Sequence, residues 1–241
     1  MENTIYIGLS RQIALQEHMS LIANNIANIN TPGYKANKIL FAEYLDKPKG
    51  MNETMSMVLD YGNYRVNTNG PIKRTDNQFD VALEGTGYMG VQGPGAKTFY
   101  TRAGAFAVNA DNTLVTQQGY PVLDAGGGTI TIPAGTTNVK IDEKGTIATD
   151  QGVIGSLMVV DFSNLQKMTP VGNTLYSTQE TPTPSERTRV IQGAQEGSNT
   201  QGVIEMTDMI EVSRNYQSVS RLLQNEHDRL RSTIRTLTSG S

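Results

Sequence analysis

Apolar residues recur at helical spacing in two stretches at opposite ends of the chain. In the last stretch, Met209 to Leu237, the steps alternate between three and four and give one seam: Met209, Val212, Tyr216, Val219, Leu223, Leu230 and Leu237. In the first, Ile5 to Ile29, they form two overlapping stripes: Ile5, Leu9 and Ile13, then Leu15, Met19, Ile22, Ile26 and Ile29. Both patterns predict amphipathic helices. The breadth of the first face favours burial among several neighbours over a two-stranded coil.

The predicted helices have recognisable ends. Asparagines gather toward the end of the first one, at positions 24, 25, 28 and 30, and Thr31-Pro32-Gly33 follows. Pro32 disfavours helical dihedral angles at Thr31, and Gly33 permits a sharp turn, so the helix should stop there. The final helix is expected to begin near Gly202. Periodicity alone favours packing of this helix on its own domain, and a seam for neighbouring chains is the alternative.

Between the helices the pattern changes to short alternating runs. From residue 76 onward, roughly ten apolar runs are separated by Gly, Asn or Asp, which is typical of an antiparallel barrel or sandwich. The most apolar run, Ser156 to Phe162, is expected to be a central strand. Residues 173–199 are polar, contain two prolines, and are expected to form an irregular return path.

Together these patterns predict an α+β chain. The two terminal helices should pair as a helical, coiled-coil-like domain made of residues 1–33 and 200–241. Residues 34–75 are expected to be an extended connector. Residues 76–199 should form the central antiparallel all-β domain, barrel-like or sandwich-like.

Composition narrows the classes of function. The 241 residues carry a net charge of −3, so the basic excess of a nucleic-acid-binding protein is missing. With no cysteine, neither disulfides nor thiolate metal sites are possible. The N-terminus has no basic segment followed by an apolar one, as a Sec-type signal peptide would. Without a run of about 18 apolar residues, no transmembrane segment is expected.

Candidate chemistry is sparse. Residues 85–90 match G-x-G-x-x-G, but strand and turn signals follow where a dinucleotide site needs a helix. His18 and His227 each stand without a second His or Cys one helical turn away, and no G-x-S-x-G elbow occurs. We therefore predict no catalytic residue, no metal, no cofactor, no small-molecule substrate and no enzyme activity. Two alternatives stay open: an enzyme site within the β-domain, and a carbohydrate- or protein-binding β-module with helical arms.

Four motifs carry a resemblance to a known family. Residues 24–35 read NNIANINTPGYK, residues 80–88 DVALEGTGY, residues 100–106 YTRAGAF, and residues 196–199 EGSN. In this order they resemble the signatures of bacterial flagellar rod and hook proteins, over nearly the whole chain. The length and the segment Glu205 to Ile210 are most similar to the proximal-rod type, with a distal-rod or hook-type axial protein as the alternative.

The resemblance implies a structural subunit of the flagellar basal-body rod. Terminal helices in that family pair within a subunit and pack against neighbours in the wall of a tube that transmits torque, which reverses the preference from periodicity alone. The implied partners are copies of the chain, other rod proteins and, during secretion, the flagellar type III export apparatus. The implied location is the periplasmic rod, reached without a cleaved signal peptide. The expected assembly interface comprises Ile5, Leu9, Leu15, Met19, Ile22, Asn24, Asn25, Ile26 and Asn28 with Met209, Val212, Tyr216, Val219, Leu223, Leu230 and Leu237.

Overall fold

The computed structural model describes residues 2–46, 55–172 and 174–239. The chain divides into two compact units, which we describe separately. Unit 1 contains residues 1–27, 37–64 and 201–241, and unit 2 contains residues 28–36 and 65–200. The α+β class is confirmed: two helices from the ends of the chain contact each other, and the remainder consists largely of antiparallel strands.

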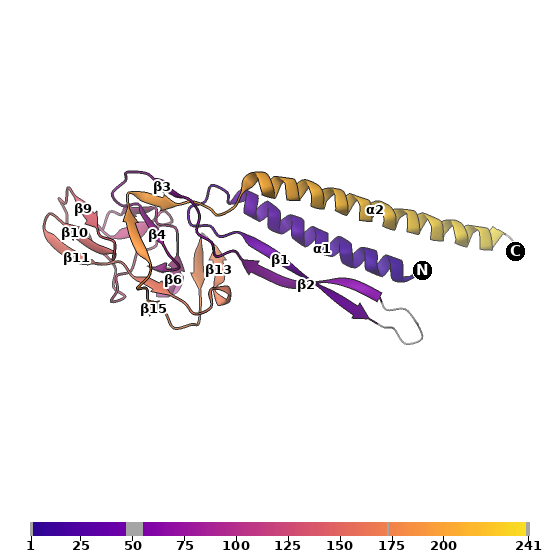
Figure 1. Cartoon of the computed structure of the whole chain (residues 1–241), viewed down its shortest axis with the longest axis horizontal. Coiled ribbons are helices and arrows are strands. Elements are labelled where there is room, and N and C mark those ends of the chain that lie inside the picture. Colours follow the sequence, from indigo (N-terminus) through magenta and orange to yellow (C-terminus); the bar gives the residue numbers. More distant parts are fainter. Residues whose placement is uncertain (1, 47–54, 173, 240–241) are drawn as a thin grey trace. The chain divides into compact units, whose positions relative to one another are not determined.

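Unit 1 is built from two long helices and a two-stranded sheet. α1 (Glu2–Ala27) and α2 (Gly202–Ser239) lie side by side (Figure 1), and the strands β1 (Asn37–Asp46) and β2 (Met55–Arg65) pair with each other. Two helix boundaries are as predicted: α1 ends before Thr31-Pro32-Gly33, and α2 begins at Gly202. Both strands fall in residues 34–75, the segment expected to be an extended connector.

Unit 2 holds the short strands. The largest sheet has six, in the order β13-β14-β6-β5-β12-β15, and a three-stranded sheet has the order β11-β10-β9. Three further pairs are β16-β4, β17-β3 and β7-β8. The strands are β3 (Ile72–Arg74), β4 (Val81–Glu84), β5 (Tyr88–Gln92), β6 (Thr98–Thr101), β7 (Phe106–Val108), β8 (Leu114–Thr116), β9 (Val139–Ile141), β10 (Thr146–Thr149), β11 (Gly152–Ser156), β12 (Val159–Asp161), β13 (Thr169–Gly172), β14 (Leu175–Ser177), β15 (Thr183–Pro184), β16 (Arg189–Gln192) and β17 (Ala194–Glu196). Short 3-10 helices occupy Pro94–Ala96 and Leu165–Lys167.

The four central strands of the six-stranded sheet contribute buried side chains to both faces. Along β5, β6, β12 and β14, successive side chains point to opposite faces, as the twofold period of a strand requires. One face joins the main apolar core, which includes Met89, Val91, Phe99 and Leu175. The other supports a second cluster, rich in aromatic rings: Tyr88, Tyr100, Val160, Phe162, Met168 and Tyr176. At the core, Gly104 lies so close to β4 that a Cβ there would come within 1.7 Å of the Val81 carbonyl oxygen.

Two predictions about the β-region are wrong. Ser156 to Phe162 is not one strand: Leu157 N–H donates to the Gly145 carbonyl and Met158 N–H to the Leu123 carbonyl, so β11 ends and β12 begins in another sheet. Residues 173–199 are not irregular, since β14, β15, β16 and β17 lie there and pair antiparallel with distant strands. The described strands form separate open sheets, so the barrel or sandwich stays a prediction.

Candidate assembly interface

The predicted seam of α2 lies beside α1. Val212 is buried, and Met209, Tyr216, Val219, Leu223 and Leu230 are half-buried. Leu223 packs against Gly8, where a Cβ would come within 2.7 Å of the Leu223 Cδ2 atom. The small residue on α1 therefore lets the two backbones approach. Leu237 lies outside the side chains that the structure describes.

Most of the predicted α1 residues also turn inward. Ile22 is buried, and Ile5, Leu15, Met19 and Ile26 are half-buried. Leu9 is 47% exposed. Asn24 is exposed and Asn28 is half-buried, so these two predicted residues sit at the rim of the packed face.

Asn25 joins three elements of unit 1. Its side-chain Nδ2 donates to Glu205 Oε2 of α2 at 3.1 Å and to the Asn37 carbonyl of β1 at 2.9 Å. Its Oδ1 accepts the Asn37 N–H at 3.1 Å. Asn25 and Glu205 are both buried, and a buried amide without such partners would cost stability. Asn25 is thus a specific polar contact within the helix pair.

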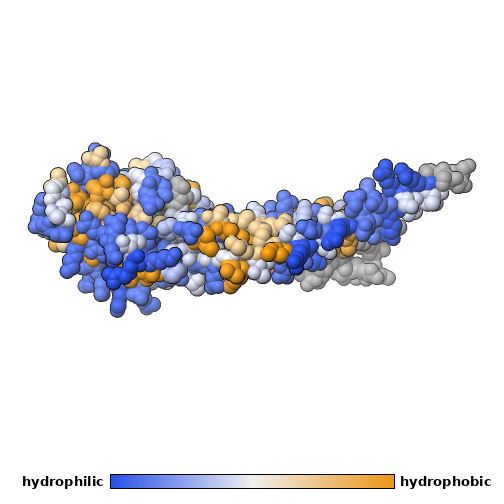
Figure 2. Space-filling view, turned by 90° about the horizontal axis from the view of Figure 1, so that it is seen from above, coloured by the Kyte–Doolittle hydropathy of each residue, from blue (hydrophilic) through white to orange (hydrophobic). Residues whose placement is uncertain are grey.

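A different set of apolar residues faces outward from the same helices. On α1, Tyr6, Leu9 and Ile13 follow one another at helical spacing and are exposed. On α2, Val203, Met206 and Ile210 repeat the same spacing and are also exposed. Figure 2 shows hydrophobic residues grouped over the first half of the helix pair and hydrophilic ones toward the end of α2. We call these six residues the outer face. They form two patches, because Gly8 lies against Leu223 and Asn25 against Glu205, which places the α1 trio and the α2 trio beside opposite ends of α1. An exposed apolar face of this kind is typical of a surface that another protein covers.

Unit 2 contains a buried charge cluster centred on Glu196. Lys35 Nζ lies 2.7 Å from Glu196 Oε1, and Arg102 Nε lies 2.7 Å from Glu196 Oε2. The side chain of Glu196 is 0% exposed and that of Lys35 is 1% exposed. Burying either charge without a partner would be very costly in free energy. Neither side chain can therefore be buried here unless its ion pair forms.

The remaining donors of the cluster reach backbone carbonyls. Arg102 donates to the carbonyls of Gly87, at 2.6 Å, and Leu83, at 3.1 Å. Lys35 donates to the Thr68 carbonyl at 2.9 Å, and the Gly70 N–H donates to Glu196 Oε1 at 3.0 Å. The cluster is closed to solvent and its charged groups are saturated with partners. It is therefore suited to holding chain segments together and not to binding a ligand.

Burial lowers the pKa of Lys35. Removal from water is the main cause, the neighbouring Arg102 cation adds to it, and Glu196 opposes it. Because the folded state then releases the proton more readily than the unfolded state, stability should rise with pH between this lowered pKa and the ordinary value of 10.5.

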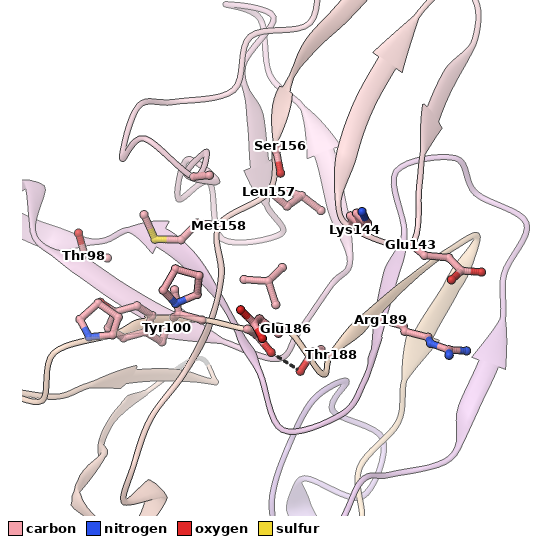
Figure 3. Close-up of a pocket in the computed structure, with 16 residues that line it drawn as sticks. Thr98, Tyr100, Glu143, Lys144, Ser156, Leu157, Met158, Glu186, Thr188 and Arg189 are labelled. Carbon is pink, nitrogen blue, oxygen red and sulfur yellow. Dashed lines mark hydrogen bonds between the residues drawn. The ribbon is translucent and has the colours of Figure 1, made fainter.

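A groove of about 800 Å³ lies elsewhere in unit 2, between the β12–β15 edge and the turn before β10. Figure 3 shows its lining, with Thr98, Tyr100 and Met158 toward one side and Glu143, Lys144 and Arg189 toward the other. Its charged side chains are exposed and of both signs. The described lining residues of the groove include no histidine and no cysteine.

Other candidate chemistry also finds no support. Within residues 2–46, 55–172 and 174–239, no three His, Asp or Glu side chains gather as metal ligands would. Nor does any helix in those ranges have the length and apolar character of a membrane span. The glycines of the G-x-G-x-x-G pattern lie at the turn after β4 and in β5; Gly85 and Gly87 pack against Thr188 and Gly90 against Met158. β4 and β5 belong to different sheets.

Comparison with known proteins decides the family. Sequence models match at three places: "Flagella basal body rod protein" at residues 5–35, "Flagellar hook protein FlgE/F/G D1 domain" at 82–149, and "Flagellar basal body rod FlgEFG protein C-terminal" at 191–236. The flagellar basal-body rod protein FlgF of Caulobacter vibrioides is 36% identical over 98% of both chains. That of Mesorhizobium japonicum is 30% identical over the full length of both. FlgG of Agrobacterium fabrum is 31% identical over 87% of this chain and 90% of its own.

The chain belongs to the flagellar basal-body rod protein family. Its four motifs now have a structural explanation, because each of them supplies part of the Glu196 cluster. Lys35 ends the first motif, the carbonyls of Leu83 and Gly87 belong to the second, Arg102 comes from the third, and Glu196 begins the fourth. The rod-family signatures therefore specify one buried junction in unit 2.

Sequence reasoning missed two features of this rod-family chain. The outer face of α2 lies off the seam and was not selected, although the Ile5–Leu9–Ile13 stripe had indicated a second apolar side on α1. The Glu196 cluster was missed because its charges are far apart in the sequence and each alone is typical of a solvated surface. The motifs were the available signal, since each of them carries a charged or glycine residue at a fixed place.

Proposed function

We propose that this chain is a structural subunit of the flagellar basal-body rod, of the proximal-rod type, which assembles through its terminal helices into the shaft that transmits torque. FlgF relatives at 30–36% identity over nearly the full length support this type. FlgG relatives at comparable length support a distal-rod subunit as the second candidate. The proposed role is mechanical, and we expect no chemical step.

The outer face is the observation that carries the proposal. Once α1 and α2 have paired through the seam, apolar side chains still point away from the pair on both helices. Burying them against adjacent rod subunits would add roughly 25 cal/mol for each Å² removed from water. Many such contacts, each modest, would add up along a tube. We infer that the seam holds one subunit together and that the outer face contacts neighbouring subunits.

The location and the route of export are part of the same proposal. A rod subunit acts in the periplasm, and passage through the flagellar type III export apparatus would need no cleaved signal peptide. The lack of cysteine is consistent with assembly in an oxidising compartment. Export can be tested by following the tagged chain into the periplasm in cells with and without a working flagellar export gate.

Substitutions on the outer face test assembly. Ile13→Asp and Ile210→Asp would each place a carboxylate in the proposed contact, at a cost of several kcal/mol. Both positions are 54% exposed, so the folded subunit should keep its helix content. We expect loss of rod assembly and of motility, measured by electron microscopy of basal bodies and by swimming.

The matched control is Val153→Asp, an equally drastic change at a position of unit 2 that is 71% exposed. It should leave assembly intact. Deleting residues 1–30 or 209–241 should also abolish assembly. Normal rods formed by the two outer-face variants, or by either truncation, would contradict the proposed role of the terminal helices.

A further inference from the structure

Four chain crossings connect the two units, at residues 27/28, 36/37, 64/65 and 200/201. The first leads from α1 into unit 2, and the last leads from unit 2 into α2. α1 and α2 also contact each other, so unit 2 bears the part of a tension between them that passes along the chain through residues 28–36 and 196–200. The way in which these two segments are joined decides which bonds bear that tension.

The two segments are bonded directly to each other. The Gly33 N–H donates to the Glu196 carbonyl at 2.8 Å, and the Asn199 N–H donates to the Tyr34 carbonyl at 3.3 Å. The Ala36 N–H donates to the Asn199 side-chain Oδ1 at 2.7 Å. The ion pair between Lys35 and Glu196 joins the same two segments. Two backbone bonds, one side-chain bond and one buried ion pair thus link residues 33–36 to residues 196–199.

The side chain of Asn199 extends the connection to the segment that follows β2. Its Nδ2 donates to the carbonyls of Val66, at 2.8 Å, and Thr68, at 3.0 Å. The Val66 N–H in turn donates to the Ala36 carbonyl at 2.8 Å. Three of the segments that leave or enter unit 2 are therefore tied at one place.

We propose that residues 33–36 and 196–199 form a mechanical clip, which passes tension from α1 to α2 without loading the β-strands enclosed between them. The bonds across the clip lie in parallel between the two pulling points, so they share the force and must break before the enclosed chain extends. About 160 residues lie between Ala36 and Glu196 and would extend by roughly 530–580 Å once released. That the clip protects these strands while a rod transmits torque rests on the proposed function. The existence of the clip does not.

Pulling single molecules tests the clip without any need for polymerisation, so its failure is distinguishable from failure of the assembly proposal. The chain has no native cysteine, so Asn30→Cys and Gln201→Cys place handles at two exposed positions that flank the clip in the full-length chain. We expect a high-force rupture followed by one long extension. Asn199→Ala and Lys35→Met should each lower the rupture force, because each removes bonds across the clip.

Gln192→Ala is the matched control. The Gln192 amide also binds backbone groups, accepting from the Ile141 N–H and donating to the Gln78 and Val139 carbonyls, but it lies outside the clip. This variant should lower thermal stability and keep the rupture force. Thermal melts of every variant confirm that it is folded before pulling.

A second pair of handles distinguishes an effect on the clip from a general loss of mechanical stability in unit 2. With Gln117→Cys and Ser163→Cys, both at exposed positions within unit 2, force bypasses the clip, so Asn199→Ala should not change the rupture force. The clip would be refuted if Asn199→Ala and Lys35→Met both ruptured at the wild-type force with the flanking handles. It would equally be refuted if Gln192→Ala lowered that force as much as they do.

Discussion

Glu196→Gln should be far more damaging than Lys35→Met, although each substitution removes a single charge from the same cluster. In the wild-type protein one buried carboxylate faces two buried cations at 2.7 Å each. Glu196→Gln leaves Lys35 and Arg102 next to each other with no counter-charge. Removing one partner of a buried ion pair typically costs about 3–5 kcal/mol, because the other charge stays buried and uncompensated.

Lys35→Met leaves a balanced pair of Glu196 and Arg102. It also removes a cation whose pKa is already lowered by burial and by its neighbour Arg102. The main loss is one of the two donors to the Thr68 carbonyl, which keeps the Asn199 amide, and this loss is worth about 0.5–1.5 kcal/mol. We therefore expect the free energies of unfolding of the two variants to differ by roughly 2 kcal/mol or more.

Urea titrations can measure this difference. Near-ultraviolet circular dichroism reports the buried aromatic rings of unit 2, and the signal at 222 nm reports mostly the helices of unit 1. In the double variant Arg102 alone is left unpaired, so the loss should be smaller than the sum of the two single losses. A Glu196→Gln variant no less stable than Lys35→Met, or a strictly additive double variant, would refute the account of the cluster.

Three further predictions follow from the packing and the ionisation of named residues. Burial raises the pKa of Tyr176 to about 12, so the folded state holds its proton longer than the unfolded state, and stability should fall by roughly 2–3 kcal/mol as pH rises from 10 to 12; Tyr176→Phe should flatten this part of a pH series of urea titrations. Gly104→Ala should destabilise by roughly 3 kcal/mol or more through its clash with the β4 backbone, whereas Gly155→Ala, which has 3.9 Å to its nearest neighbour atom, should melt near the wild-type temperature. Gly8→Val should weaken helix pairing and lower helix content, and Leu223→Ala in the same chain should restore part of it by removing the clashing side chain; an uncorrected loss would count against this packing.

The terminal helices could be predicted from the sequence because their signals are local. A period of three to four residues, the proline after α1 and the glycine at the start of α2 all act within a few positions of the residues they affect. The strands between residues 173 and 199 were missed because their pairing is not local. Val190 of β16, for example, is buried through its pairing with Leu83 of β4, more than 100 positions away.

The two apolar faces of the helices illustrate a further limit. Helical periodicity shows which residues share a side, but it does not show which side packs inside the subunit. Leu9 and Leu15 were both predicted in the assembly interface; Leu9 is exposed and Leu15 is half-buried. Only the position of α2 beside α1 separates the seam from the outer face, and that position depends on contacts between residues about 200 positions apart.

The charge cluster raises the question of why an apolar junction would not serve as well. Buried ion pairs can often be replaced by apolar residues without loss of stability. Here the cations also satisfy backbone carbonyls, since Arg102 caps those of Leu83 and Gly87 and Lys35 caps that of Thr68. An apolar side chain at position 102 would take this donor from the buried carbonyls of Leu83 and Gly87, at about 1–3 kcal/mol each. The Thr68 carbonyl would still accept from the Asn199 amide if Lys35 were replaced. Directional bonds also determine which segments meet and in which register, whereas apolar contacts are not directional. The cluster therefore positions the segments that enter and leave unit 2, and its three charged residues all lie within the rod-family motifs.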